Sequence, residues 1–148
     1  MVSEALLTEF GAKKVNFKKG EIVFKQGGPA KYYFQIHKGT IKMNNFNDEG
    51  KEFVQGIFTE GNSFGEPPLF INDPYPANAV AVTSVEVYLL KKDKFLELLV
   101  LNPEIHLLMT TNLARRLYYK SVMASEISSH DPEHRILQLI DYFKLKIN

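Results

Sequence analysis

The chain has 148 residues, of which 45% are hydrophobic and 12% aromatic, so it can form a folded domain with a substantial core and is not a disordered chain. Its 18 Lys and Arg against 17 Asp and Glu give a formal charge of +1, far less basic than a domain whose whole surface binds nucleic acid. The absence of cysteine excludes disulfides, thiolate nucleophiles and metal sites built on thiolates.

The sequence carries no signal for a membrane. The longest apolar runs, such as residues 98–101, are far shorter than the ~20 residues that a membrane-spanning helix needs. No basic and then apolar leader opens the chain. We therefore expect a cytoplasmic protein.

Glycine divides the chain into two parts. All nine glycines lie between Gly11 and Gly65. Because glycine supplies the positive-φ residues of tight turns, this distribution is typical of a β region followed by an α region. A short helix at 4–10, with Ser3 as its N-cap, is expected before the first strand.

The glycine-rich part contains short segments of β-branched and aromatic residues, several of which alternate with polar residues. Turn signals such as Lys38-Gly39 and the tetrapeptide at 47–50 separate them. Six or more short strands with regular turns predict a sandwich, a jelly roll or a barrel. The expected strands lie near residues 15–17, 22–24, 32–37, 40–46, 52–58, 79–82 and 85–90.

The second part of the chain is expected to be helical. A helix at 93–101 ends before Asn102-Pro103-Glu104, which has the features of a new helix start: asparagine accepts at the N-cap, proline fits the first turn and glutamate complements the helix dipole. The helical pattern then continues to about Ser128, over ~38 Å at 1.5 Å per residue. The segment 131–133 indicates a second start, for a last helix that runs through Phe143.

The long helix has two apolar faces. One contains Ile105, Met109 and Leu113, and the other follows the 4-3-4-3 steps of a coiled-coil seam. Two faces indicate two partners, the β part of the same chain and the same helix of a second copy, so we expect a homodimer. The alternative is one broad face that packs on the β part. The candidate dimer residues are Leu113, Leu117, Lys120, Ala124 and Ile127.

No pattern in the sequence indicates catalysis. The serines lack a nucleophile elbow, and neither glycine-rich phosphate-binding motif is present. The four histidines do not form a metal-ligand pattern, so we expect no catalytic residue, no metal and no enzyme activity. The alternative is a cupin-like metal-binding enzyme, for which His37 and His106 are the histidines available before residue 128.

The segment 61–82 is the candidate ligand site. Phe64-Gly65-Glu66 ends a strand and is followed by a short helical turn, a loop and another strand. This order exposes successive backbone N–H groups, which suit an anion, and the Glu66 carboxylate could accept a hydrogen bond from a sugar hydroxyl. The alternative is a proline-stiffened loop without a ligand.

These motifs, in their order and spacing, resemble the effector domain of the catabolite activator/FNR family of bacterial transcription regulators. The resemblance covers almost the whole chain and implies a mainly β fold with α-helices: an eight-stranded, jelly-roll-like β-roll (a double-stranded β-helix), a long dimerisation helix and a short C-terminal helix. The implied domains are 1–101, 102–128 and 129–148, the last being the hinge and first helix of a DNA-binding domain. The residues that carry it are Lys19-Gly20-Glu21, Lys38-Gly39, Gly61, Phe64-Gly65-Glu66, Asn102-Pro103-Glu104, Leu113-Ala114-Arg115-Arg116-Leu117 and Asp131-Pro132-Glu133-His134-Arg135-Ile136.

The resemblance also implies a mechanism. An effector binds between the roll and the long helix, the dimer helices shift, and the hinge re-aims a pair of helix-turn-helix modules. For a cyclic nucleotide such as cAMP or cGMP, it implies Phe64, Gly65, Glu66, Pro76, Ala77 and Asn78 around the sugar and phosphate, and Arg116, Lys120 and Ser121 facing the base.

The chain departs from the family pattern in two ways. Pro76 stands where nucleotide-binding relatives carry the arginine that pairs with the phosphate, and the only arginines of the chain are Arg115, Arg116 and Arg135. Whether the effector is a cyclic nucleotide, another small ligand or absent therefore stays open. The chain also ends at Asn148, without the residues of a helix-turn-helix module, so we do not expect it to read DNA by itself.

Overall fold

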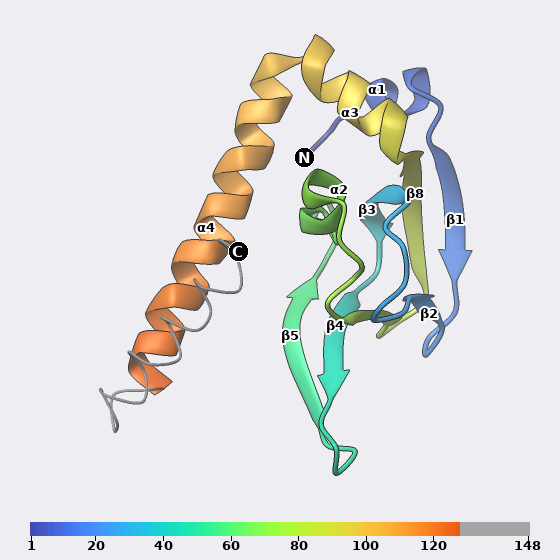
Figure 1. Cartoon of the computed structure of the whole chain (residues 1–148). Coiled ribbons are helices and arrows are strands. Elements are labelled where there is room, and N and C mark those ends of the chain that lie inside the picture. The colour runs from blue at the N-terminus through green and yellow to red at the C-terminus, as the bar shows by residue number, and fades with distance from the viewer. Residues whose placement is uncertain (128–148) are drawn as a thin grey trace. The chain divides into compact units, whose positions relative to one another are not determined.

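The computed structural model describes residues 1–127 (Figure 1). The chain divides into two compact units, Met1–Met109 and Thr110–Asn148, and each is described by itself. The expected hinge, the candidate helix after it and the residues His130 and His134 lie outside the described residues.

The first unit contains a β-roll, as predicted. Within residues 1–127, eight strands form two four-stranded antiparallel sheets, with the orders β1-β8-β3-β6 and β2-β7-β4-β5. The strands are β1 (Lys13–Phe17), β2 (Ile22–Phe24), β3 (Tyr32–Lys38), β4 (Ile41–Phe46), β5 (Glu52–Phe58), β6 (Ser63–Phe64), β7 (Asn78–Ala81) and β8 (Val85–Lys91).

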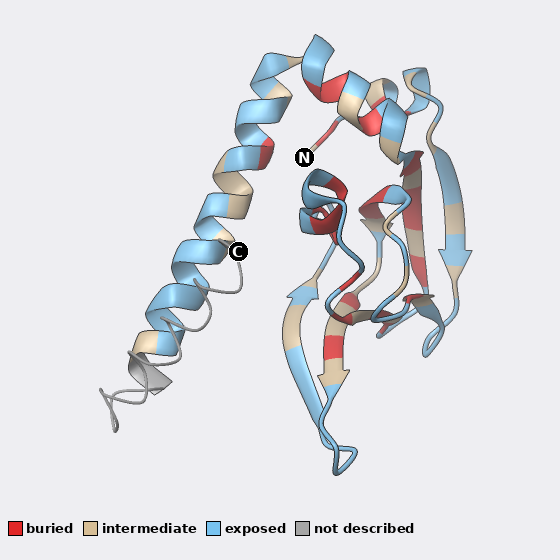
Figure 2. Cartoon of the chain, in the orientation of Figure 1, coloured by how far each residue is buried: buried red, intermediate tan, exposed pale blue. Residues whose placement is uncertain are grey.

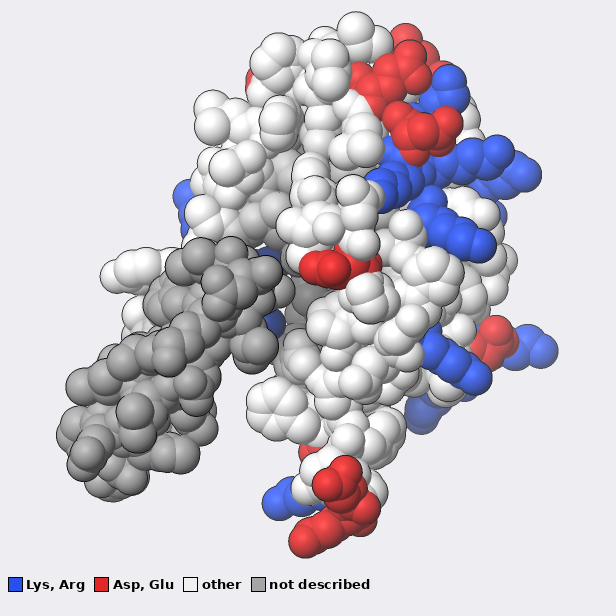
Figure 3. All heavy atoms as spheres, viewed as in Figure 1, with Lys and Arg blue, Asp and Glu red and all other residues white. Residues whose placement is uncertain are grey.

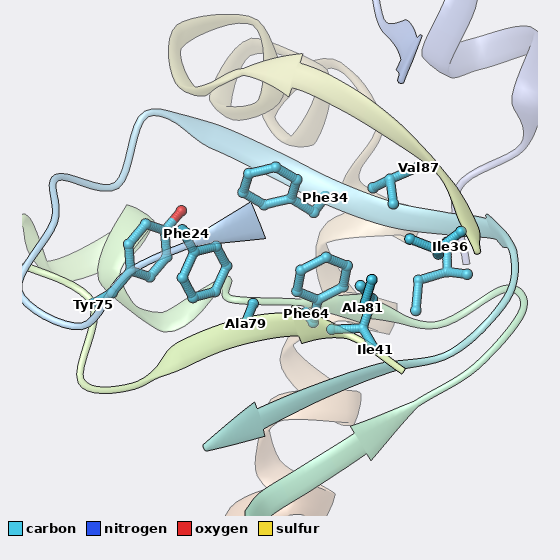
Figure 4. Packing of buried hydrophobic residues seen from close by; sticks show 10 residues of the cluster. Phe24, Phe34, Ile36, Ile41, Phe64, Tyr75, Ala79, Ala81 and Val87 are labelled. Atoms are coloured by element: carbon cyan, nitrogen blue, oxygen red, sulfur yellow. The ribbon is translucent and has the colours of Figure 1, made fainter. Parts of the chain in front are cut away.

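The core of the roll lies between the two sheets, because alternate side chains of each strand point inward. In β8, for example, Val85 and Val87 are buried in this core and Leu89 packs against it. Aromatic rings fill much of the interior, as Figure 4 shows. The buried cluster consists of Phe24, Phe34, Ile36, Ile41, Phe64, Tyr75, Ala79, Ala81, Val85 and Val87.

One glycine is required by its surroundings. Gly39 turns the chain from β3 into β4 with a φ of +100°, which L-residues rarely adopt. A Cβ atom there would clash with the carbonyl oxygen of Ser84 and would come within 2.9 Å of the Cα of Val85. The Lys38-Gly39 turn that the sequence indicates is therefore also a point of close approach between two strand connections.

The helices are α1 (Glu4–Glu9), α2 (Pro67–Ile71), α3 (Lys92–Leu101) and α4 (Pro103–Ile127). Ser3 caps α1 as predicted, since its side chain accepts from the backbone N–H of Leu6. Asn102 differs from the prediction: its side-chain amide donates to the carbonyl of Leu98 at 2.9 Å and so caps the end of α3. Its backbone carbonyl accepts from Ile105 at the start of α4. No helix among residues 1–127 is both long and apolar enough to cross a bilayer.

The hairpin of β4 and β5 extends beyond the core. Figure 2 shows its distal part as largely exposed, while the neighbouring parts of the roll contain many buried residues. Phe46 and Phe53 lie in this part and are 57% and 66% exposed. β7 begins one residue earlier than predicted, because Asn78 already pairs with Asn44 of β4.

Candidate functional site

The segment that we identified as the candidate site lies at the junction of β6 and α2. Gly65 follows β6 with a φ of +73°. A Cβ atom at this position would lie 3.0 Å from the ring of Phe24 and 3.3 Å from the ring of Tyr75. The chain therefore passes so close to two aromatic rings that a larger residue than glycine does not fit without movement.

The side chain of Glu66 points into the protein. Glu66 is fully buried, at 0% exposure. Burial, and next the nearby carboxylate of Glu66, raise the pKa of Tyr75 to about 12. Tyr75 is itself only 3% exposed, and its hydroxyl finds no hydrogen-bond partner among the described residues. A carboxyl group and a phenol thus share the apolar interior of the roll.

Aromatic side chains pack against the segment at Gly65. The rings of Tyr75 and Phe24 are stacked, with centroids 3.6 Å apart and planes at 6° (Figure 4). The ring centroid of Phe24 also lies 6.0 Å from that of Phe64 and 5.6 Å from that of Phe34. The roll interior at this point is a packed core.

Six of the nine candidate ligand residues lie in the segment 64–79, which we call the cassette. The structure places these six at different depths. Phe64, Gly65, Glu66 and Ala77 are buried, Asn78 is half-buried and Pro76 is exposed. The buried ones act as core residues in this conformation, so a ligand at the surface meets Pro76 and Asn78 first. The sequence showed which residues lie in the segment but not this difference in depth.

A set of amide side chains that the sequence analysis missed holds the end of the segment; we call it the amide cluster (Gln26, Asn44, Asn45 and Asn78). Asn45 donates to the carbonyl of Pro76 at 2.8 Å and to Gln26 at 3.0 Å. Asn78 accepts from the backbone N–H of Gln26 at 2.9 Å and donates to Asn44 Oδ1 at 3.2 Å. The cluster joins β7, the turn after β2 and the β4–β5 hairpin.

An ion pair extends the amide cluster along the hairpin. Glu52 accepts from Asn44 at 2.6 Å and lies 2.8 Å from the ammonium of Lys42. The hydrogen bonds from Lys42 and then Asn44 lower the pKa of Glu52. The side chains that could otherwise face a ligand at this edge of the roll are therefore engaged with one another.

The segment does not fit a cyclic phosphate. Residues 64–79 contain no lysine and no arginine, whereas Glu66 and Asp73 contribute two carboxyl groups. The carbonyl of Pro76 already accepts from Asn45, and the rings of Phe24 and Tyr75 pack against Gly65. A phosphate here would lack the charge-assisted hydrogen bonds that usually hold it, each of which contributes about 1.5–3 kcal/mol.

The other three ligand candidates lie on α4 in the second unit. Arg116 is half-buried, and Lys120 and Ser121 are exposed. The Ser121 hydroxyl donates to the backbone carbonyl of Leu117 at 2.9 Å, within the same helix. These three residues therefore belong to a different compact unit from the cassette residues.

The candidate dimer residues also lie on α4. Leu113 is half-buried, Leu117 is 66% exposed, and Lys120 and Ala124 are exposed. Ile127 is the last residue of the helix. Further large apolar side chains on this part of α4 are exposed, namely Tyr118, Tyr119, Val122 and Met123.

The two histidines of the metal-enzyme alternative do not meet in a ligand set. His37 Nδ1 lies 2.7 Å from a carboxylate oxygen of Glu4, and His37 Nε2 lies 3.7 Å from Glu86. His106 is exposed on α4. Among residues 1–127, no group of three or more His, Asp or Glu side chains is arranged to hold a metal ion.

Comparison with known proteins shows a family match over most of the roll. Residues 14–102 match the cyclic nucleotide-binding domain. The chain is similar to the cAMP-activated global transcriptional regulator CRP of Haemophilus influenzae, with 30% identity over 115 residues, covering 77% of this chain and 51% of the relative. It thus spans about half the length of this relative, which by name is a transcription regulator.

Solved structures show the same fold. The Thermus thermophilus catabolite activator protein superimposes with a TM-score of 0.75 at 23% identity, covering 84% of this chain and 58% of that one. The sensor domain of the transcriptional regulator DNR from Pseudomonas aeruginosa superimposes with a TM-score of 0.65 at 30% identity, covering 78% of this chain and 76% of that one.

Proposed function

Because the chain belongs to the cyclic nucleotide-binding domain family and is related to the CRP/FNR transcription regulators, we propose that it is the effector-sensing and dimerisation part of such a regulator. The observation that carries this proposal is the complete two-sheet roll followed by α4, which continues to Ile127. DNA would be bound through a helix-turn-helix module outside the described residues, and the regulator would act in the cytoplasm. The relative is by name a transcription regulator that cAMP activates, so the function we propose for this chain is allosteric, with effector and DNA bound at separate sites.

The effector of this sensor is not a cyclic nucleotide held by its phosphate. The cassette supplies no cation, because residues 64–79 contain no lysine and no arginine. A bidentate arginine–phosphate pair engages two charge-assisted bonds, so its absence weakens binding roughly a hundredfold or more. A neutral small ligand is compatible with this environment.

Calorimetric titration of the chain with cAMP and with cGMP tests this statement. We expect no saturable heat at micromolar nucleotide. Micromolar binding that disappears in Glu66→Ala would instead identify a cyclic-nucleotide sensor and would contradict the proposal about the effector.

The dimer forms through α4. Leu117 is 66% exposed, and seam spacing places it in line with Leu113, so burying both against a second copy removes apolar surface from water. We expect sedimentation to show a dimer of the unchanged chain and a monomer of Leu117→Glu. The matched control is Val100→Glu on α3, which replaces a 76% exposed apolar residue outside the seam and should stay dimeric. A monomeric unchanged chain, or dimers of both variants, would contradict the seam.

A second candidate function is a dimerisation module whose roll binds nothing. The observation that favours it is the interior itself, where Tyr75 stacks on Phe24 and both rings pack against Gly65. The two functions differ in their response to ligands. Saturable stabilisation of the chain by a neutral metabolite in a thermal-shift screen, lost in Glu66→Gln, indicates a sensor. A dimer that no compound stabilises indicates the inert module.

A further inference from the structure

Two adjoining hollows lie along the loop at 27–32, α2 with the loop after it, and the junction of β8 and α3, and Glu66 lines neither of them. The first has a volume of about 370 Å³ and the second about 310 Å³. Ala30 and Lys92 line both hollows, so the two adjoin, and we call the pair the depression. Figure 3 shows several basic side chains gathered at the upper right of the molecule, with acidic side chains beside them. Each hollow has a volume in the range of sites for small organic ligands.

The second hollow is lined by three lysines, Lys31, Lys91 and Lys92, which come from two segments far apart in the sequence. The backbone N–H of Lys92 donates to the carbonyl of Lys31 at 3.0 Å, and Lys91 pairs with Tyr32 across β8 and β3. The positions of the three Cα atoms are therefore fixed by backbone hydrogen bonds. Changing a lysine side chain leaves this framework in place.

These lysines are not neutralised by neighbouring carboxylates. Among the described residues, none of the three takes part in an ion pair, whereas Lys94 pairs with Glu97 at 3.4 Å. Asp93 also lines the second hollow, but one of its oxygens accepts from the backbone N–H of Lys94. Three cations and one carboxylate leave a positive balance in this hollow.

The first hollow has a different character. Its lining is largely apolar, with Pro29, Pro68 and Pro74 on its walls. Asn72 and Asp73 provide polar groups, and the ammonium of Lys92 hydrogen-bonds the side-chain oxygen of Asn72. A mainly apolar hollow thus adjoins a cationic one.

We propose that this depression binds a small organic anion, with an apolar or aromatic body over the prolines and a phosphate or carboxylate head on Lys31, Lys91 and Lys92. Lysine ammonium groups bind such heads as point charges and do not need the planar geometry of an arginine pair. The site is separate from Glu66, so it stands whether or not the roll has an effector. α2 and Asn72 belong to the cassette. An anion that draws the Lys92 ammonium away from Asn72 would therefore remove a hydrogen bond between the cassette and the start of α3.

Titration of the ¹⁵N-labelled chain, followed by amide chemical shifts, tests the site. The probes are phenyl phosphate and benzoate, which carry a body and a head, with inorganic phosphate and benzyl alcohol as the head and the body alone. We expect saturable shifts at residues 27–32, 72–74 and 91–93 with phenyl phosphate or benzoate, and weaker binding of both controls. Which of the two heads binds more tightly identifies the head group.

The matched variants are Lys31→Gln/Lys91→Gln and, as a control with the same change of charge, Lys18→Gln/Lys19→Gln. Both pairs are exposed, so neither change should prevent folding, and the dispersion of the amide spectrum verifies this. One exposed charge pair contributes up to about 1 kcal/mol, and the first variant removes two lysines from the hollow. We therefore expect about tenfold weaker binding in the first variant and less than twofold weaker binding in the control. Added salt should weaken binding to the unchanged chain.

Two results would overturn the proposal. One is the absence of saturable shifts around the depression with either amphipathic anion. The other is equal loss of binding in both variants, which would show that the anion responds only to the overall charge of the domain.

Discussion

Replacing Tyr75 by phenylalanine tests the description of the roll interior. The Tyr75 side chain is 3% exposed, and its hydroxyl has no hydrogen-bond partner among the described residues. An unsatisfied buried hydroxyl costs about 1–3 kcal/mol. Tyr75→Phe removes this group and keeps the ring stacked on Phe24, so we expect the free energy of unfolding at pH 7 to rise by about 1 kcal/mol.

The same substitution should change the pH dependence of stability. Burial and Glu66 raise the pKa of Tyr75 to about 12 from an ordinary value of 10.0. Above pH 10 the unfolded chain releases this proton and the folded chain keeps it. The contribution of Tyr75 to the free energy of unfolding is therefore fully present below pH 10 and is lost as the pH rises toward 12. At pH 11 the loss amounts to about 1.4 kcal/mol, and Tyr75→Phe escapes it.

Urea unfolding followed by circular dichroism at pH 7 and pH 11, at one protein concentration, measures both effects. Tyr33→Phe is the control, because the Tyr33 hydroxyl donates to Gln35 at 2.7 Å and its removal should lower stability by about 1 kcal/mol. If Tyr75→Phe is also less stable at pH 7 and its difference from the unchanged chain does not grow at pH 11, the hydroxyl has a partner and the reasoning is wrong.

Two further substitutions test the framework by urea unfolding. Gly39→Ala should lower the free energy of unfolding by about 3 kcal/mol or more, because the new Cβ clashes with the Ser84 carbonyl in addition to the strain of a positive φ. The control is Gly50→Ala, which has a positive φ but open space around it and should lower the free energy of unfolding by only about 1 kcal/mol. Equal losses would show that the close approach at Gly39 is unimportant. Gln35→Leu should cost about 2–3 kcal/mol, because buried Gln35 bonds both the N–H and the carbonyl of Val2, and a neutral outcome would mean that water replaces these bonds.

The fold was predictable from the sequence because its signals are local. Gly39 marks a turn by its conformational freedom, and the alternation in 85–90 marks a strand by its period of two. The same reasoning placed Ser3 correctly at the start of α1. For the Asn102 side chain the prediction was wrong: we expected its oxygen to accept at the start of α4, whereas its amide donates at the end of α3. The residue lies between two helices, and either helix can use its side chain.

The candidate site was predictable only as a segment. Phe64-Gly65-Glu66 has a recognisable order, but the packing around Gly65 depends on Phe24 and Tyr75, which reach it from elsewhere in the chain. The second hollow, with its three lysines, also depends on long-range contacts, since Lys31 and Lys91 come together only through the pairing of β3 with β8. Such long-range contacts leave no periodic trace in the sequence.

The amide cluster has a consequence for the evolution of this chain. Two pairs of amide side chains bond each other: Asn45 donates to Gln26, and Asn78 donates to Asn44, so replacing one member leaves its partner without that hydrogen bond. Mutational drift at one member of a pair is therefore expected to be followed by compensating exchange at the other. Lineages that keep the hairpin bound to the cassette should inherit each pair as a set.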